Sequence, residues 1–219
     1  MPKQTKDYLD RLLNDADADT RESILDLYNK WKSEKSISHF DHFWMKVNKN
    51  FSRSRLREFN GVSFEEFVYE SIRSHHSNLK ERSFWGLDPD PSKRKKVKFQ
   101  IFRGLKHKFD IAVYGVKGNP AILIECKTFP NYIEILGIAK LGKLPVFQQA
   151  HIIYVTHLMT SWDLENGLRE FILENISEIR NFNFYKIDNL VWTNKDPLLY
   201  SEGLDQEKGF LQSFNSKLT

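Results

Sequence analysis

Two carboxylates and one ammonium group stand at the ends of two short apolar runs near the middle of this chain of 219 residues. Asp110 precedes the apolar run 111–114, and Glu125 and Lys127 follow the apolar run 121–124. Carboxylate oxygens are the ligands that Mg²⁺ prefers in proteins. The residue types therefore predict a metal site with a built-in lysine.

The segment between the two apolar runs predicts a tight turn, because glycine, asparagine and proline gather in 115–120. A turn centred on Lys117 and Gly118 would make the numbers of paired residues sum to 235, so that Asp110 would face Glu125. Opposed side chains in an antiparallel pair have Cβ atoms about 4.5 to 5.5 Å apart. One divalent cation could then bridge the two carboxylates.

Strand periodicity predicts that Glu125 and Lys127 share one face, while Cys126 points into the packed side of the sheet. Glu125 with Lys127 is the only place in the chain where lysine follows an acidic residue by two positions. The alternative is a solvated surface pair, which would contribute little. Yet the four residues before Glu125 are apolar and indicate a buried strand, which favours charges that are paired or that bind an ion.

Asp110 followed by Glu125-Cys126-Lys127 resembles the motif of the PD-(D/E)XK nuclease superfamily, which includes most type II restriction endonucleases. The resemblance covers residues 109–127, and Phe109 replaces the proline of the family's name. A literal Pro89-Asp90 lies upstream in a predicted loop without a following apolar strand. The resemblance implies an α/β fold with a restriction-endonuclease-like core, in which helices flank a mixed sheet of antiparallel hairpin strands and a parallel strand.

The resemblance also implies the role of each residue in the motif. Asp110 and Glu125 would hold Mg²⁺ together with the backbone carbonyl of Cys126, and Lys127 would orient or deprotonate the attacking water. A glutamate after an aromatic residue on a preceding helix often completes such sites, and Glu65 after Phe64 has this placement. It would be an outer ligand.

Helical spacing separates Glu65 from its neighbour Glu66. Gly61 predicts a break, and Ser63 is placed to cap a helix that follows it. Within that helix, Glu65 shares its face with apolar residues at 68, 69 and 72, whereas Glu66 is predicted to point toward water or the helix cap. Which of the two is the helix carboxylate of the site stays open from the sequence.

The function that the resemblance implies is a Mg²⁺-dependent, site-specific endonuclease of the type II restriction kind. It would cut double-stranded DNA as a homodimer and leave 5′-phosphate ends. The alternatives are a structure-specific repair or junction nuclease, and a DNA-binding subunit of a larger nuclease assembly.

Composition agrees with an acidic partner only mildly, because 33 Lys and Arg against 29 Asp and Glu give a net charge of +4 and a pI near 9.0. A single cysteine excludes an internal disulfide and a zinc cluster of usual spacing. No apolar run approaches the roughly 18 to 20 residues that span a bilayer, and no signal peptide is evident. We expect a cytoplasmic protein without a membrane partner.

Basic residues are concentrated between positions 93 and 108, where eight Lys or Arg occur and no acidic residue does. Such a stretch could neutralise DNA phosphates. The alternative is a solvated basic edge strand that resists aggregation. The predicted DNA contacts are Lys93, Arg94, Lys95, Lys96, Lys98, Arg103 and Lys106, with Arg53 and Arg55 in a second cluster.

The predicted organisation is a helical N-terminal region at 1–60, a nuclease core at 61–195 and a C-terminal tail at 196–219 packed on the same domain. Residues 81–96 are expected to form a loop. After it we expect three antiparallel strands, the first following the basic run and the other two forming the hairpin. The remaining predicted elements are a helix at 132–140, a parallel strand at 152–155, a helix at 162–176 and a last strand at 182–192.

Overall fold

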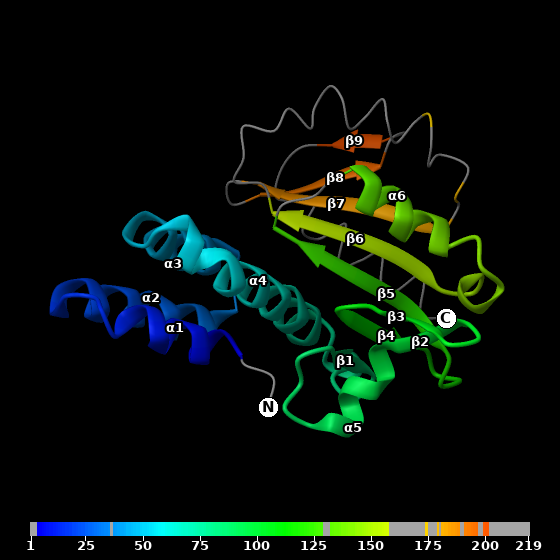
Figure 1. Cartoon of the computed structure of the whole chain (residues 1–219), viewed down its shortest axis with the longest axis horizontal. Coiled ribbons are helices and arrows are strands. Elements are labelled where there is room, and N and C mark those ends of the chain that lie inside the picture. The colour runs from blue at the N-terminus through cyan, green and yellow to red at the C-terminus, as the bar shows by residue number, and fades with distance from the viewer. Residues whose placement is uncertain are drawn as a thin grey trace.

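The computed structural model describes residues 4–35, 37–128, 132–157, 181–188, 191–196 and 199–201, together with Glu174 and Ile179. The fold is α/β and is built on a mixed sheet of seven strands in the order β1-β4-β5-β6-β7-β8-β9 (Figure 1). The strands are β1 (Ser83–Trp85), β4 (Ile111–Tyr114), β5 (Pro120–Lys127), β6 (His151–His157), β7 (Phe182–Asp188), β8 (Val191–Asp196) and β9 (Leu199–Ser201). The predicted α/β class and mixed sheet are confirmed.

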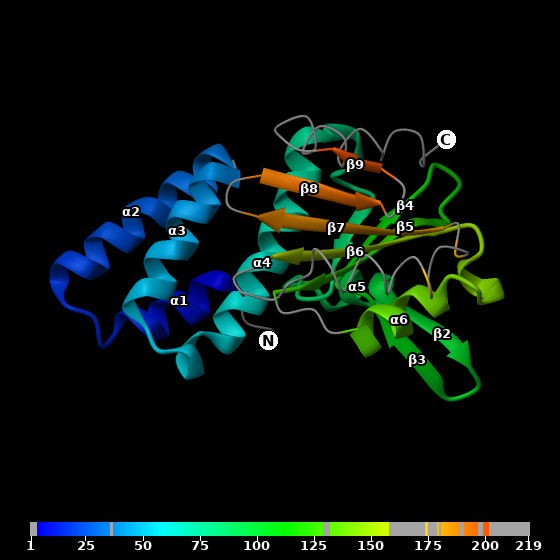
Figure 2. The same cartoon turned by 90° about the horizontal axis from the view of Figure 1, so that it is seen from above.

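Helices cover both faces of this sheet in the described part of the chain. The helices are α1 (Thr5–Leu13), α2 (Ala18–Glu34), α3 (Ile37–Asn50), α4 (Arg53–His75), α5 (Pro91–Arg94) and α6 (Tyr132–Leu141), with short 3₁₀ turns η1 (Ser77–Leu79), η2 (Lys95–Val97) and η3 (Pro145–Phe147). Figures 1 and 2 show that α4 lies between the sheet and the bundle of α1, α2 and α3. The segment 1–60, for which a helical region was predicted, contains α1 to α3 and the first residues of α4.

The hairpin of β4 and β5 has the predicted register. Three successive pairs, from Ile111 with Ile124 to Val113 with Ile122, have numbers that sum to 235, and the register shifts only near the turn. Gly118 adopts φ 78°, which favours glycine in this turn. Asp110 precedes β4 and has no register partner, but its N–H donates to the Ile124 carbonyl at 3.0 Å and holds it at the open end of the hairpin.

Strand β6 lies parallel to β5, as predicted for a strand reached through a helical crossover. The crossover contains α6, which covers the face of the sheet opposite α4. In the β5 and β6 register, Glu125 is the neighbour of Tyr154 and Lys127 is the neighbour of Thr156. The motif residues therefore lie on a strand that has partners on both sides.

Helix α4 corrects the prediction of a helix that begins at Ser63 after a break at Gly61. The helix starts ten residues earlier, at Arg53, and continues through Gly61. A glycine costs a helix only about 1 kcal/mol relative to alanine, and the tertiary packing of this helix outweighs that penalty. The Ser63 hydroxyl donates to the Asn60 carbonyl within the helix and caps nothing. The predicted boundary between residues 60 and 61 therefore falls inside one continuous helix.

The predicted loop at 81–96 contains regular structure, and the predicted third antiparallel strand is a different one. β1 lies within this segment and pairs with β4. Asp90 caps α5 by accepting from the Ser92 N–H at 2.8 Å. The basic strand β2 (Lys98–Phe102) pairs only with β3 (Leu105–Lys108), in a separate two-stranded ribbon. Periodicity indicated the strand but could not indicate its partner.

The end of the chain differs from the prediction at 182–192, where two strands occur in place of one. β7 is parallel to β6, and β8 returns antiparallel to it. β9 extends the sheet beside β8. The helix predicted at 162–176 lies outside the described residues except for Glu174, as does the tail from 202. No helix among the described residues combines the length and apolar character needed to cross a bilayer.

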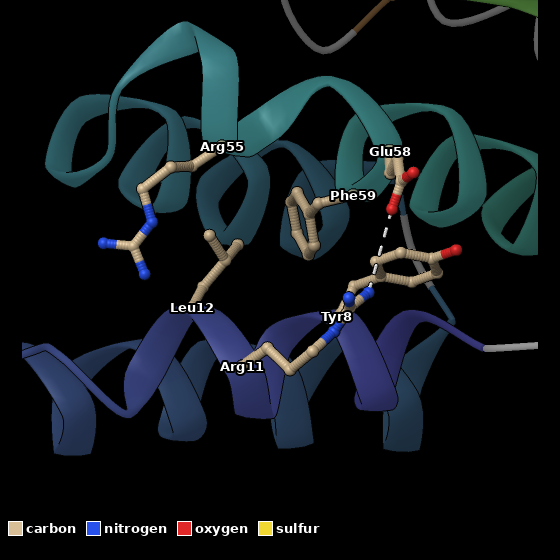
Figure 3. Close-up of a pocket in the computed structure, with 6 residues that line it drawn as sticks. All are labelled: Tyr8, Arg11, Leu12, Arg55, Glu58 and Phe59. Atoms are coloured by element: carbon tan, nitrogen blue, oxygen red, sulfur yellow. Dashed lines mark ion pairs between the residues drawn. The ribbon is translucent and has the colours of Figure 1, made fainter.

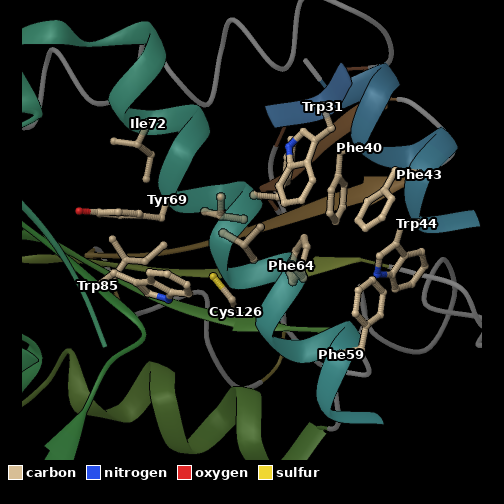
Figure 4. Packing of buried hydrophobic residues seen from close by; sticks show 14 of the residues in the cluster. Trp31, Phe40, Phe43, Trp44, Phe59, Phe64, Tyr69, Ile72, Trp85 and Cys126 are labelled. Atoms are coloured by element: carbon tan, nitrogen blue, oxygen red, sulfur yellow. The ribbon is translucent and has the colours of Figure 1, made fainter. Parts of the chain in front are cut away.

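Two buried clusters fill the space on either side of the sheet. The larger contains the aromatic side chains of α2, α3 and α4 and reaches Trp85 and Cys126 on the sheet (Figure 4). The smaller lies between the sheet and α6 and contains Leu123 and Tyr154. This division confirms that Cys126 points into the packed side while Leu123 lies on the other face. Because α4 belongs to the larger cluster, its position relative to the sheet is fixed by packing.

Candidate functional site

Asp110, Glu125 and Lys127 meet where β4 and β5 separate. The Cys126 N–H donates to Asp110 Oδ2 at 2.8 Å, which fixes that carboxylate beside β5. Lys127 Nζ lies 2.9 Å from Glu125 Oε1, so the predicted shared face is confirmed. On its other side Lys127 Nζ lies 3.2 Å from Glu134 Oε1, which α6 supplies. The motif residues are therefore brought together by the hairpin register and by the crossover helix.

Glu65 reaches the same place from α4, as predicted. Its Oε2 accepts from the Trp85 indole N–H at 3.2 Å. Trp85 is held in turn by stacking on Tyr69, with ring centroids 5.7 Å apart. We refer to Glu65, Asp110, Glu125, Lys127 and Glu134 as the Lys127 cluster.

The Lys127 cluster contains more carboxyl groups than ammonium groups. Burial raises the pKa of Glu65 to about 7, although the Trp85 N–H and the ammonium groups of Lys108 and Lys127 act against the rise. Burial, with the carboxylates of Glu65 and Glu125, also raises the pKa of Asp110 well above its ordinary value. Both residues keep some surface exposed. Crowded carboxylates that resist ionisation are typical of a site that accepts a cation.

Lys127 is held in its protonated form. Burial alone would lower its pKa, but the charges of Glu125 and Asp110 and the hydrogen bond to Glu125 outweigh burial and raise the pKa. An ammonium ion cannot accept a proton. In this charge state Lys127 can orient water or stabilise negative charge on a phosphate, whereas a role as a base would require the neighbouring carboxylates to be neutralised first.

One oxygen of Glu125 is buried without a hydrogen-bond partner. Glu125 Oε1 binds Lys127, whereas Oε2 is not hydrogen-bonded. His107 Nε2 of β3 lies 3.7 Å from Oε2, which is too far for a good hydrogen bond, and it is itself buried without a hydrogen-bond partner. A buried carboxylate oxygen without a partner is costly, and a metal ion would satisfy it.

The carboxylates of the Lys127 cluster have the type and charge that the predicted magnesium site requires. Among the residues that the structure describes, no group of three or more His, Cys, Asp or Glu is close enough to hold a metal ion as it stands. Lys127 occupies one oxygen of Glu125, and the Cys126 N–H occupies one oxygen of Asp110. The Cys126 carbonyl as a ligand stays a prediction.

Glu66 does not point toward water, so that prediction is wrong. It is buried, with Oε1 2.6 Å from Lys32 Nζ and Oε2 accepting from the Thr5 N–H at 3.1 Å. Lys32 also binds Glu70 at 3.0 Å, and Lys35 binds Glu70 at 2.7 Å. The face of α4 that helical spacing assigned to solvent is covered by the helical region. We refer to Lys32, Lys35, Glu66 and Glu70 as the Lys32 cluster.

The predicted DNA contacts fall in two places. Lys93 and Arg94 lie on α5, Lys95 and Lys96 on η2, Lys98 on β2, Arg103 in the following turn and Lys106 on β3; all are exposed except Arg94, which is half-buried. Arg53 and Arg55 lie in the first turn of α4, about 15 Å along the helix from Glu65 at 1.5 Å per residue. Only the first group continues into the segment that carries Asp110.

Arg55 lines a separate pocket of about 190 Å³ between α1 and α4 (Figure 3). The other lining residues are Tyr8, Arg11, Leu12, Glu58 and Phe59. Arg55 is paired with Asp15 at 2.8 Å, and Arg11 lies 3.9 Å from Glu58. Both guanidinium groups already have carboxylate partners, and the pocket contains no residue of the Lys127 cluster.

Several residues at the site were missed by reasoning from the sequence. His107, Glu134 and Tyr154 all act on the Lys127 cluster. Burial, with the charges of Glu134 and Glu125, raises the pKa of Tyr154, so its hydroxyl stays protonated. A signal existed for Glu134, because it lies in the first turn of the helix predicted directly after Lys127. No sequence signal joined His107 to Glu125, because the ribbon was not predicted.

Comparison of the chain with models of known protein families gives no match. Comparison with curated proteins likewise gives no significant match. The functional argument therefore depends on the geometry and charge of the Lys127 cluster.

Proposed function

We propose that the protein is a Mg²⁺-dependent DNA endonuclease with a restriction-endonuclease-like core, and that the Lys127 cluster is its active site. The observation that carries the proposal is the unpartnered, buried Oε2 of Glu125 among carboxylates whose pKa values are raised. A surface ion pair does not need a buried carboxylate oxygen without a partner. A site that must accept a divalent cation does need such an oxygen, because the oxygen becomes a ligand of the cation.

Asp110 and Glu125 would hold the metal ion, with Glu65 as an outer carboxylate beside Trp85. A bound Mg²⁺ would supply charge stabilisation for the phosphate and lower the pKa of water. The protein would orient these groups. α4 carries Glu65, and hydrogen bonds to the Ile124 carbonyl and the Cys126 N–H hold Asp110 beside β5.

Lys127 would place its ammonium group against the scissile phosphate and offset the charge that develops there. It already binds Glu125 and Glu134, and moving it toward a phosphate would free one oxygen of Glu125. The same movement would therefore open a ligand position and deliver a cation to the substrate. This coupling favours phosphate chemistry over a structural metal site.

The experiment is cleavage of supercoiled plasmid DNA in the presence of Mg²⁺, with EDTA as the metal control. We expect cleavage that EDTA abolishes and that Lys127→Ala removes. Lys140→Ala, in an exposed lysine of α6, is the matched control and should cleave normally. Metal-independent cleavage, or normal cleavage by Lys127→Ala, would contradict the assignment.

The pattern of products distinguishes the substrate class within this proposal. Discrete bands from a large DNA indicate site-specific cleavage of the restriction kind, which we expect. Cleavage confined to branched or mismatched duplexes would indicate a structure-specific repair nuclease. A restriction-type enzyme would act as a homodimer, because two sites related by a twofold axis match duplex symmetry, and sedimentation analysis would test this expectation.

A further inference from the structure

The ribbon of β2 and β3 stands apart from the main sheet. Its register pairs Lys98 with Lys108 and Gln100 with Lys106, and its last pair is Phe102 with Leu105. Gly104, with φ 82°, completes the turn at the tip. Figure 2 shows the ribbon extending from the body of the protein beside α6. Residues on one face of this ribbon are exposed, whereas Phe99, Ile101 and His107 on the other face are half-buried.

One face of the ribbon is anchored next to the Lys127 cluster. The ring of Phe99 lies 5.6 Å from that of Phe147 and 6.0 Å from that of Phe109, between centroids. Its register partner His107 contacts the ring of Phe109 and places Nε2 3.7 Å from Glu125 Oε2. The orientation of the ribbon relative to the site is therefore fixed by aromatic packing.

The opposite face of the ribbon presents positive charge to solvent. Lys98 and Lys106 are exposed on it, and no acidic residue occurs from position 93 to 108. Lys108 leans back over Gly86, where an added Cβ would lie 2.6 Å from its Cε. Like charges gathered on one face destabilise a strand pair unless an anion lies against them. This face is complementary to a row of phosphates.

The tip of the ribbon presents large apolar side chains in spite of this charge. Phe102 is 61% exposed and its partner Leu105 is 55% exposed. A surface that needed only solubility would carry polar residues there. An aromatic and an aliphatic side chain at the end of a basic ribbon have the chemistry of a wedge that enters a stack of bases.

We propose that the ribbon is a DNA-docking element, in which Lys98 and Lys106 contact phosphates and the Phe102–Leu105 tip inserts between base pairs of duplex DNA. The inference rests on the proposed function for its choice of DNA as partner. A two-stranded ribbon fits a DNA groove, and inserted apolar side chains unstack and kink the duplex. The anchored face would then hold the distorted duplex over the Lys127 cluster.

The experiment measures DNA unwinding by the full chain carrying Lys127→Ala, which is expected to bind without cutting. Nicked plasmid is sealed by DNA ligase at saturating protein, and the linking number is compared with that of plasmid sealed alone. Adding Phe102→Ala with Leu105→Ala should remove most of the linking-number change while affinity for a short duplex falls less than about 10-fold, because phosphate contacts dominate affinity. Val116→Ala, another exposed apolar residue in a turn, should change neither quantity.

Adding Lys98→Ala with Lys106→Ala in the same background should weaken binding and lower the slope of log affinity against log salt by about 1.8, at roughly 0.9 per phosphate contact. An unchanged linking-number effect in the tip variant, or an unchanged salt slope in the lysine variant, would overturn the proposal. Loss of dimers in the tip variant with unchanged DNA parameters would overturn it as well, by identifying a contact between copies of the chain. If the protein unwinds DNA through the ribbon but the unsubstituted chain never cleaves with Mg²⁺, the nuclease proposal fails alone.

Discussion

The Lys32 cluster and the Lys127 cluster are built from the same residue types, and they differ in whether their carboxylates are neutralised. Each contains a lysine that binds two glutamates within 3.2 Å. In the Lys32 cluster, two ammonium groups meet two carboxylates, and all four carboxylate oxygens have a partner. In the Lys127 cluster, one buried oxygen has none.

The carboxyl pKa values shift in opposite directions in the two clusters. Burial alone would raise the pKa of Glu70, but Lys35 and Lys32 outweigh burial and lower it. At Glu65 and Asp110 the pKa is raised, because burial and neighbouring carboxylates prevail. The Lys32 cluster, in which two ammonium groups meet two carboxylates, joins the helical region to α4, whereas the Lys127 cluster contains more carboxyl groups than ammonium groups. This imbalance, and not the presence of charged residues, is what distinguishes the proposed site from the Lys32 cluster.

The largest expected effect separates the two lysines. Lys127→Ala should lower plasmid cleavage by at least about 100-fold, because a positioned charge or proton-transfer group commonly contributes this much. Lys32→Ala should instead lower the free energy of unfolding by about 3 kcal/mol, because it leaves partly buried carboxylates unpaired. Cleavage rates and urea unfolding of both variants check the contrast. If Lys32→Ala remains folded and loses cleavage as Lys127→Ala does, the comparison fails.

The neighbouring glutamates of α4 should respond in opposite ways. Glu66→Gln should lower the free energy of unfolding by about 1.5 to 3 kcal/mol, because it weakens a hydrogen-bonded ion pair with Lys32. Glu65→Gln should leave stability unchanged or raised, since it removes a crowded carboxylate, while lowering cleavage. Unfolding and cleavage are measured on the same preparations. A cleavage defect in folded Glu66→Gln without one in Glu65→Gln would transfer the catalytic role.

The two clusters should give opposite pH dependence in the metal-free protein. The pKa of Glu65 rises from 4.5 to about 7 on folding, so the folded state binds more protons and stability falls as the pH rises through that window. The pKa of Glu70 is lowered, so its contribution is present above 4.5 and is lost at lower pH. The measurement is urea unfolding in EDTA from pH 3.5 to 7.5. Glu65→Gln should remove the fall in stability that Glu65 causes as the pH rises, which amounts to up to about 1.4 kcal/mol per pH unit. The contribution of Glu70 at low pH should remain. A Glu65→Gln profile parallel to the wild type would refute the shift.

The smallest effect concerns the helix that carries both glutamates. A Cβ added at Gly61 would meet nothing within 4 Å. Gly61→Ala should therefore stabilise the protein by about 0.5 to 1 kcal/mol and leave cleavage unchanged. Thermal unfolding measures the change, and a loss of stability would mean that α4 requires flexibility at this position.

The hairpin and Glu65 could be predicted because periodicity and turn residues are local signals. A sum of 235 followed from the turn around Gly118, and the structure has this sum for the pairs from Ile111 with Ile124 to Val113 with Ile122. The face of α4 that carries Glu65 followed from spacing in the same way. These inferences required only which side chains share a face.

The sequence could not predict which segments pack against each face of a helix or strand. Spacing separated Glu66 from Glu65 but could not reveal that Lys32 and Thr5 lie over Glu66. The three-residue strand β1 is too short for a periodic pattern, so its pairing with β4 was missed. His107 reaches Glu125 only because the ribbon folds back on Phe109 and Phe147. The burial of Glu66, the pairing of β1 with β4 and the approach of His107 to Glu125 all depend on contacts between segments that are distant in sequence.

The central claim, that the Lys127 cluster is completed by a cation, is tested most directly by thermal unfolding during a titration with Mg²⁺. The account predicts that Mg²⁺ stabilises the wild type and Glu66→Gln, by about 2.7 kcal/mol at 100 times the dissociation constant. It also predicts no stabilisation of a variant with Asp110→Asn and Glu125→Gln. Absence of stabilisation in the wild type, or equal stabilisation of that double variant, would contradict the account.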